Sequence, residues 1–229
     1  MPILESRDHK KYINILGSDG TFRLEVDSDH PEAARRDYET SDGKTGTKYE
    51  LVFQTAKGKI TDVDFWSGDY GESIILTLES EDETEEPVKI SINSSTPYGE
   101  DFMKKLPNID LSKEVLLRPF SFEDENGKTR RGINITQGGK DDKVENFYYD
   151  KEQKKAINGY PSPEDADSKS KDDWKVFFIQ ARKFLLEQTK SLVEEKRKNG
   201  ELKERAQEKT SDEIYDEYSK DAPEEETPF

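Results

Sequence analysis

Hydrophobic and polar residues alternate along much of the first 150 positions, a pattern typical of β-strands that bury one face. The stretch YINILGSDGTFRLEV at 12–26 predicts two short strands joined by a turn at Gly17–Gly20. Residues 31–39, PEAARRDYE, predict a short helix. A longer alternation over 48–66 predicts one long strand that bends at Gly58.

Further strands and one short helix follow in a definite order. Strands are predicted at 73–80, 87–93, 113–124 and 129–136, and residues 144–150 are expected to extend the sheet. Thr96 and Pro97 are typical of a helix start, and the helix should end at Pro107. Three strands, a helix and two strands are the elements of a five-stranded OB-type barrel. We therefore expect a mainly β fold with added helices: this barrel, an N-terminal hairpin and a long C-terminal helix.

The C-terminal third of the chain differs in composition from the first 157 residues, which we assign to the barrel domain. Residues 158–171 are rich in Pro, Ser and Asp and predict a linker. Residues 172–200 predict an amphipathic helix that packs on the barrel or on another copy, and 201–229 an acidic disordered tail. The predicted apolar stripe of the helix consists of Trp174, Phe177, Phe178, Ala181, Phe184, Leu185, Gln188 and Leu192.

Composition and charge narrow the classes of function. Only 30% of the 229 residues are hydrophobic and 38% are charged, so a modest core with solvated segments is expected. The chain has no cysteine, which excludes disulfides, thiolate zinc sites and a cysteine nucleophile. No apolar run resembles a signal peptide or a membrane span, so we expect a cytoplasmic protein, in the host cytoplasm if it is viral.

The net charge of −16 is concentrated in two segments. Residues 79–87 carry six acids, and residues 212–229 carry eight acids and one lysine. The rest of the chain is close to neutral, so a cationic surface is compatible with the negative total.

Catalytic groups are sparse, and we expect no enzyme, cofactor or metal site. His9 and His30 lie in polar stretches. Asp62 and Asp64 share a strand face and offer a conceivable metal site, but a solvated face is the simpler interpretation. Gln137 to Lys140, QGGK, lacks the spacing of a phosphate loop and is interpreted as a hairpin turn.

A groove for a single nucleic-acid strand needs aromatic rings for base stacking and cations for phosphates. The most informative stretch is LLRPFSFEDENGKTRRG at 116–132, where alternation places Arg118, Phe120 and Phe122 on one strand face. The candidate stacking rings are Trp66, Tyr70, Tyr98, Phe120, Phe122 and Tyr148. The candidate phosphate-binding cations are Lys57, Lys59, Lys89, Arg118, Lys128, Arg130, Arg131 and Lys140.

The element order and the ending EEETPF resemble the single-stranded-DNA-binding proteins of bacteria and their phages, whose acidic tail ends in Pro-Phe. The resemblance covers about 48–150 for element order and 212–229 for the tail, and the added hairpin and helix fit the phage branch better. It implies sequence-independent binding of single-stranded DNA in replication, recombination or repair. It also implies that replication or repair proteins bind the tail through Asp221, Glu224, Glu225, Glu226, Pro228 and Phe229.

The acidic tail suggests its own regulatory role. A tethered segment of net charge −7 mimics a nucleic acid and can cover the groove until DNA displaces it.

The alternative is a protein-binding β-barrel adaptor or virion assembly factor without nucleic-acid affinity, and a carboxylate-metal nuclease is a third, weaker hypothesis. The sequence leaves open whether the protein is a monomer or a dimer, and whether RNA competes with DNA.

Overall fold

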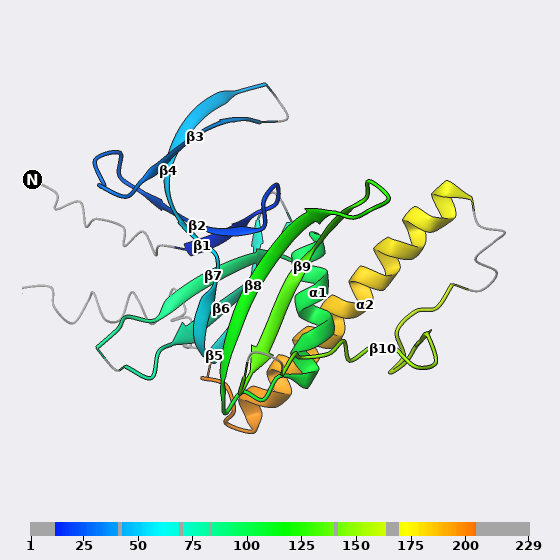
Figure 1. The fold of residues 1–229 in the computed structure, drawn as a ribbon. Coiled ribbons are helices and arrows are strands. Elements are labelled where there is room, and N and C mark those ends of the chain that lie inside the picture. Colours follow the sequence, from blue (N-terminus) through cyan, green and yellow to red (C-terminus); the bar gives the residue numbers. More distant parts are fainter. Residues whose placement is uncertain are drawn as a thin grey trace, which may run out of the picture.

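The computed structural model describes residues 12–40, 43–68, 71–82, 84–139, 142–163 and 170–204. Nine strands form one mixed sheet in the order β3-β4-β2-β1-β7-β6-β5-β8-β9, with helices on one side of the strands β5 to β9 (Figure 1). The strands are β1 (Tyr12–Leu16), β2 (Thr21–Val26), β3 (Ala34–Glu39), β4 (Thr45–Phe53), β5 (Ala56–Gly68), β6 (Gly71–Glu79), β7 (Val88–Asn93), β8 (Glu114–Glu123) and β9 (Thr129–Gln137). The helices are α1 (Pro97–Lys105), the 3-10 turn η1 (Leu106–Asn108) and α2 (Lys171–Lys198).

The N-terminal hairpin is confirmed as β1 and β2, joined by the predicted turn. Gly20 adopts a positive φ of 68°, and a Cβ at this position would lie 2.4 Å from the backbone of Phe120 in β8. Only glycine fits such a left-handed turn pressed against another strand. The turn thus fixes the hairpin against β8, far away in the sequence.

The predicted helix at 31–39 is wrong, because Ala34–Glu39 is strand β3, paired with β4. Arg36 donates to Glu50 of β4 at 2.8 and 2.5 Å, and the Glu50 side chain is only 5% exposed. An ion pair that crosses between two strands therefore helps to hold a segment with few apolar residues in the extended conformation.

The long strand predicted over 48–66 is two strands, β4 and β5, separated at Gln54 and Thr55. Strand β4 pairs with β2 and β3, whereas β5 pairs with β6 and, through its first residues, with β8. Gly58 lies near the start of β5, where a Cβ would approach the carbonyl oxygen of Glu79 to 2.8 Å. The break sends the two halves of the alternation to different parts of the sheet.

The described part of the chain is mainly β with two α-helices, but the expected five-stranded barrel is not confirmed, because the sheet formed there has two free ends and is open. Strand β7 pairs in parallel with β1. The outer edge of β9 faces α1, where Asp101 accepts from the Ile133 N–H at 2.8 Å and Lys105 donates to the Ile133 carbonyl at 2.6 Å. Helix side chains thus satisfy backbone groups that would otherwise pair with another strand.

Residues 144–150 join the large sheet only at their start, where the Val144 N–H donates to the Ile135 carbonyl of β9 at 2.8 Å beside a bridge between Lys143 and Thr136. Tyr149–Asp150 forms β10, which pairs with β11 (Lys155–Ala156) in a separate two-stranded sheet. This small ribbon lies between the main sheet and α2 in the chain order.

Helix α2 is confirmed almost at its predicted bounds. Ser170 and Asp173 form a capping box at its start, and Asn199 and Gly200 follow its end. The side chains that it buries are Ala181, Leu185, Thr189, Val193 and Arg197. The buried face thus steps by four and differs from the predicted stripe, in which Gln188 is exposed.

The end of α2 covers part of an inner strand of the sheet. Arg197 donates to the Val63 carbonyl at 2.7 Å and to the Asp62 carboxylate at 2.8 Å. The Lys203 N–H, just beyond the helix, donates to the Thr61 carbonyl at 3.0 Å. These contacts fall on β5 beyond Lys59, where its recorded pairing with β8 ends, so α2 covers the part of β5 that β8 leaves open.

Candidate nucleic-acid interface

The outward face of the β8–β9 hairpin brings together the most informative of the predicted residues. The strand register places Arg118 opposite Asn134, Phe120 opposite Gly132 and Phe122 opposite Arg130. Opposite residues of an antiparallel pair point to the same side, so two rings and two guanidinium groups share this face. The other face carries Leu117, Pro119, Ile133 and Ile135, which are buried.

The two phenylalanine rings form a pair at the surface. The ring centroids of Phe120 and Phe122 lie 5.7 Å apart with an interplanar angle of 35°. Phe122 is 55% exposed and Phe120 is half-buried. An exposed ring of this size, supported by a second ring, is a suitable platform for a planar apolar ligand.

The cations of this face differ in how far they are neutralised. Arg130 donates to Asp124 at 2.8 Å. Backbone donation from Lys128, together with Arg130, lowers the pKa of the Asp124 carboxyl below its usual value. Arg118 is exposed, and no ion pair joins it to a residue within the described ranges. Arg118 is therefore available to a phosphate.

Lys128 and Arg131 have different positions on the same hairpin. Lys128 is exposed at the turn, where its N–H donates to Asp124 at 3.0 Å. Arg131 pairs in register with Ser121, on the opposite face from Phe122, and donates to the Ser121 hydroxyl at 3.4 Å. Lys128 can thus join the outward face, whereas Arg131 does not.

Lys57 and Lys59 lie beside the hairpin at the start of β5, because Lys57 pairs in register with Leu116. Glu114 forms an ion pair with Lys57 at 2.5 Å, and this hydrogen bond raises the pKa of the lysine. Lys59 stands between Glu79 and Glu114 in the sheet register. Both lysines extend the face, with part of their charge offset by glutamates.

Trp66 forms a second aromatic site at the end of β5. Its side chain is 62% exposed and lies over Gly68, where a Cβ would be 2.3 Å from the indole ring. The ring borders a cavity of about 310 Å³ that Tyr98 and the carboxamides Asn14 and Asn93 also line. Glycine at 68 therefore leaves room for the indole ring beside a cavity that has both apolar and polar lining residues.

Tyr98 and Tyr148 are buried, so neither ring is offered for stacking. Tyr98 is 2% exposed at the start of α1, and burial raises the pKa of its hydroxyl. Tyr148 is 5% exposed and contacts the rings of Phe147, Tyr160 and Phe184. Tyr98 lines the Trp66 cavity, whereas Tyr148 belongs to the packing beneath α2.

The remaining predicted positions are dispersed or lie outside the described residues. Lys89 is half-buried on β7, opposite Thr77 of β6 and Tyr12 of β1. Tyr70, Lys140 and the tail positions Asp221, Glu224, Glu225, Glu226, Pro228 and Phe229 lie outside the described residues.

Sequence reasoning missed a cluster of charges where β2, β3 and β4 adjoin. Arg23 and Arg36 converge on Glu50, with the Arg23 guanidinium 3.9 Å from its carboxylate. Lys48 pairs with Glu25 at 2.5 Å. A cavity of about 300 Å³ lies among these side chains. The charged residues of ARRDYE at 34–39 were the signal in the sequence that could have indicated this cluster. In the structure, each cation of the cluster has an acidic partner.

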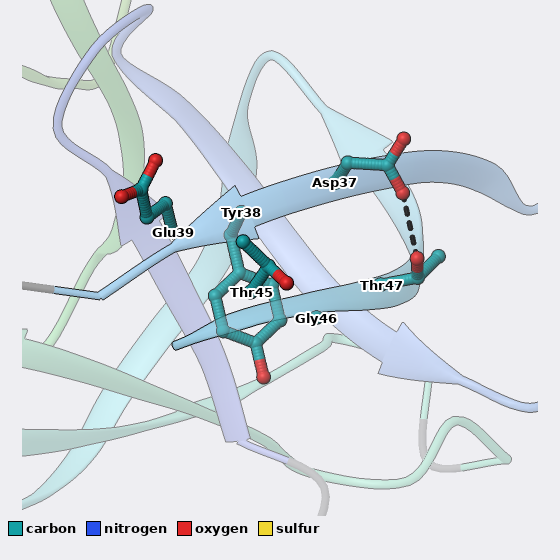
Figure 2. Close-up of a pocket in the computed structure, with 6 residues that line it drawn as sticks. All are labelled: Asp37, Tyr38, Glu39, Thr45, Gly46 and Thr47. Atoms are coloured by element: carbon teal, nitrogen blue, oxygen red, sulfur yellow. Dashed lines mark hydrogen bonds between the residues drawn. The ribbon is translucent and has the colours of Figure 1, made fainter. Parts of the chain in front are cut away.

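The β3–β4 hairpin holds a larger hollow of about 450 Å³, lined by Asp37, Tyr38, Glu39, Thr45, Gly46 and Thr47. Figure 2 shows the Asp37 carboxylate toward Thr47, whose hydroxyl donates to it at 2.6 Å, and the Tyr38 ring beside Gly46. Hydrogen bonds from Thr47 and Arg35 lower the pKa of Asp37. Two carboxylates at this hollow disfavour a phosphate ligand.

The carboxylate pair considered for metal binding has another partner. Arg197 lies 2.8 Å from Asp62 and 3.6 Å from Asp64. Within the described ranges, no group of three or more His, Asp or Glu side chains is arranged to hold a metal ion.

The described part of the chain contains no helix of the length and apolarity that a membrane span requires.

No family model, curated protein or solved structure matches this chain. We therefore base the functional proposal on the geometry of the outward β8–β9 face and the Trp66 site.

Proposed function

We propose that the protein binds single-stranded DNA without regard to sequence, using the outward β8–β9 face. The observation that carries this proposal is the ring pair of half-buried Phe120 and exposed Phe122, which shares its face with Arg118 and Arg130. Stacking on an aromatic ring holds any base, and it contributes about 1–3 kcal/mol per base. The guanidinium groups on this face bind the phosphates of the same strand.

Trp66 provides a second, separate site in our proposal. Its exposed indole offers another stacking platform, and Asn14 and Asn93 in the cavity beside it offer hydrogen-bond partners to a base edge. Lys57 and Lys59 lie beside the hairpin and add positive charge near the path of the strand.

We further propose that β5 to β9 with α1 are an OB-type barrel opened between β7 and β9. The partial order β7-β6-β5-β8-β9, with α1 between the third and fourth of these strands in sequence, supports this interpretation. In such barrels the loop between the first and second strands and the loop between the fourth and fifth strands flank the ligand. The Trp66 end of β5 and the β8–β9 turn occupy the corresponding positions.

The acidic segment 212–229 is a competitor for the same cations in this proposal. It carries eight acids and one lysine, and it is tethered to the body at high effective concentration. DNA that displaces this segment frees Phe229 and the glutamates before it to recruit replication or repair proteins. Removal of residues 212–229 should therefore tighten DNA binding.

A fluorescence titration with an oligo-dT strand tests the proposal. The chain has two tryptophans, so a Trp174→Phe background leaves Trp66 as the only indole. We expect quenching of Trp66 and a binding constant that falls steeply as salt rises, because bound phosphates release counterions. In Arg118→Glu the affinity should fall and the slope of log K against log salt should decrease by about one for the lost phosphate contact.

Arg35→Glu is the matched control, because Arg35 is equally an exposed arginine but lies on β3. It should change neither the affinity nor the slope beyond a small effect of net charge. If the full chain and the chain without residues 212–229 both ignore oligo-dT at low salt, the proposed function is wrong.

The alternative is a protein-binding adaptor, which the exposed apolar residues of α2 favour. Val176, Phe178 and Ile179 are more than half exposed. Recovery of a protein partner after nuclease treatment, by a chain without affinity for oligo-dT, would support the adaptor instead.

A further inference from the structure

The first ten residues of α2 expose apolar side chains although the helix is well formed. The capping box of Ser170 and Asp173 sets its start, and its buried face begins only at Ala181. Before that point Val176 is 52% and Ile179 is 64% exposed. Figure 1 shows this end of α2 extending past the strands. A helix segment with exposed branched apolar residues gains free energy when another surface covers it.

The exposed side has a pattern that is complementary to itself. Asp172, Val176, Ile179 and Lys183 follow the spacing i, i+4, i+7 and i+11. At about 100° per residue these four positions fall within an arc of about 60°. An acid thus begins the stripe, a base ends it, and two apolar residues lie between them.

We propose that this stripe is the contact between two copies of the chain, paired as antiparallel α2 helices about a two-fold axis. In that arrangement Val176 of one copy packs on Ile179 of the other, twice by symmetry. Asp172 of each copy then meets Lys183 of the other at both ends of the contact. The symmetry turns one row of four side chains into two apolar contacts and two ion pairs.

The charges of the stripe favour a second copy over the other occupants of such a face. Asp172 now pairs with Lys175 at 2.8 Å and Lys183 lies 3.9 Å from Glu187, but all four side chains are more than 60% exposed. Exposed ion pairs within a helix contribute little to stability. The free-energy cost of replacing them with ion pairs across an interface is therefore small. An acidic occupant such as residues 212–229 would meet Asp172 as well as Lys183.

The contact is small, so the dimer should be weak and depend on protein concentration. It is independent of the proposed DNA binding, because β8, β9 and Trp66 take no part in it. The pairing should therefore occur in the absence of nucleic acid.

A charge-exchange experiment on the full chain, followed by sedimentation, tests this pairing. The wild type should show a monomer–dimer equilibrium. Asp172→Lys and Lys183→Asp each place like charges opposite one another twice, so each should weaken the dimer at least about tenfold. The double variant D172K/K183D restores opposite charges in the same positions and should recover the dimer to near the wild-type level.

Ile179→Asp tests the apolar part and should abolish the dimer, with helix content followed by far-UV circular dichroism. Glu145→Lys is the matched control, since Glu145 forms an exposed ion pair with Lys151 and is not part of the α2 stripe, and it should leave the dimer unchanged. A wild type that stays monomeric at high concentration overturns the proposal. The stripe would then be covered by residues 205–229 or by another protein. A dimer that survives Ile179→Asp, or a double variant that fails to recover it, also overturns the proposal.

Discussion

The two outer hairpins of the sheet, β3–β4 and β8–β9, carry similar residue types but differ in what those residues are free to do. In β3–β4 the arginines are bound by acids, with Arg36 on the buried Glu50 and Arg35 on Asp37. In β8–β9, Arg118 and the ring of Phe122 face outward. Cations joined to buried acids stabilise a fold, whereas free cations beside exposed rings are able to bind a ligand. The number of positive residues in a segment therefore says little about nucleic-acid binding until their partners are known.

The sharpest way to separate the hairpins is to remove one arginine from each. Arg36→Ala leaves the Glu50 carboxylate, 5% exposed, without its nearest cation, since the Arg23 guanidinium is 3.9 Å away. We expect a loss of about 2–3 kcal/mol in the free energy of unfolding, measured by urea denaturation. Arg130→Ala breaks an exposed pair and should cost less than about 1 kcal/mol. Equal losses in the two variants would contradict the distinction.

Removal of one ring from each hairpin should give the reverse order in a binding assay. Phe122→Ala removes an exposed platform and should lower the affinity for oligo-dT by about tenfold, because a stacked base contributes about 1–3 kcal/mol. Tyr38→Ala removes the ring beside Gly46 on β3–β4 and should leave the affinity unchanged. A fluorescence titration of both variants in the Trp174→Phe background measures the difference. A larger loss of affinity in Tyr38→Ala than in Phe122→Ala would indicate that the binding surface lies on β3–β4.

The smallest effect concerns the pH dependence of the charged cluster. Hydrogen bonding to Arg36 lowers the folded-state pKa of Glu50 from its ordinary value of 4.5. Such a group stabilises the fold above the unfolded-state pKa, and this stability is lost as the pH falls through the lower folded-state pKa. The difference in unfolding free energy between wild type and Arg36→Ala should thus be largest near pH 7 and shrink below about pH 4. Urea denaturation near pH 7 and below about pH 4 measures this difference. A difference that grows in acid would contradict a lowered pKa for Glu50.

The sequence was sufficient where the determinants are local. The turn at Gly17–Gly20, the cap at Thr96 and the alternation in β8 each depend on a few adjacent residues, and the structure confirms all three elements. The shared face of Arg118, Phe120 and Phe122 follows from the same alternation. Their role in binding DNA stays a prediction.

Elements that depend on distant partners were not predictable in the same way. Strand β3 has few apolar residues, and its extended form depends on Glu50, 14 residues after Arg36. The break at Gln54 and Thr55 has no glycine or proline to mark it. The buried face of α2 is set by the body that it packs against, so the helix period alone placed the face incorrectly at Gln188.

The contacts of α1 with Ile133 have a consequence for assembly as well as for the fold. An uncovered sheet edge is a template on which another chain can add a strand, and long sheets aggregate through such edges. At β9 the carboxylate of Asp101 and the ammonium group of Lys105 occupy the backbone sites that an added strand would need at Ile133. At the opposite end, β3 has the sequence ARRDYE, whose charged side chains discourage a newcomer by desolvation. The molecule limits the growth of its own sheet with a helix at one end and with charge at the other.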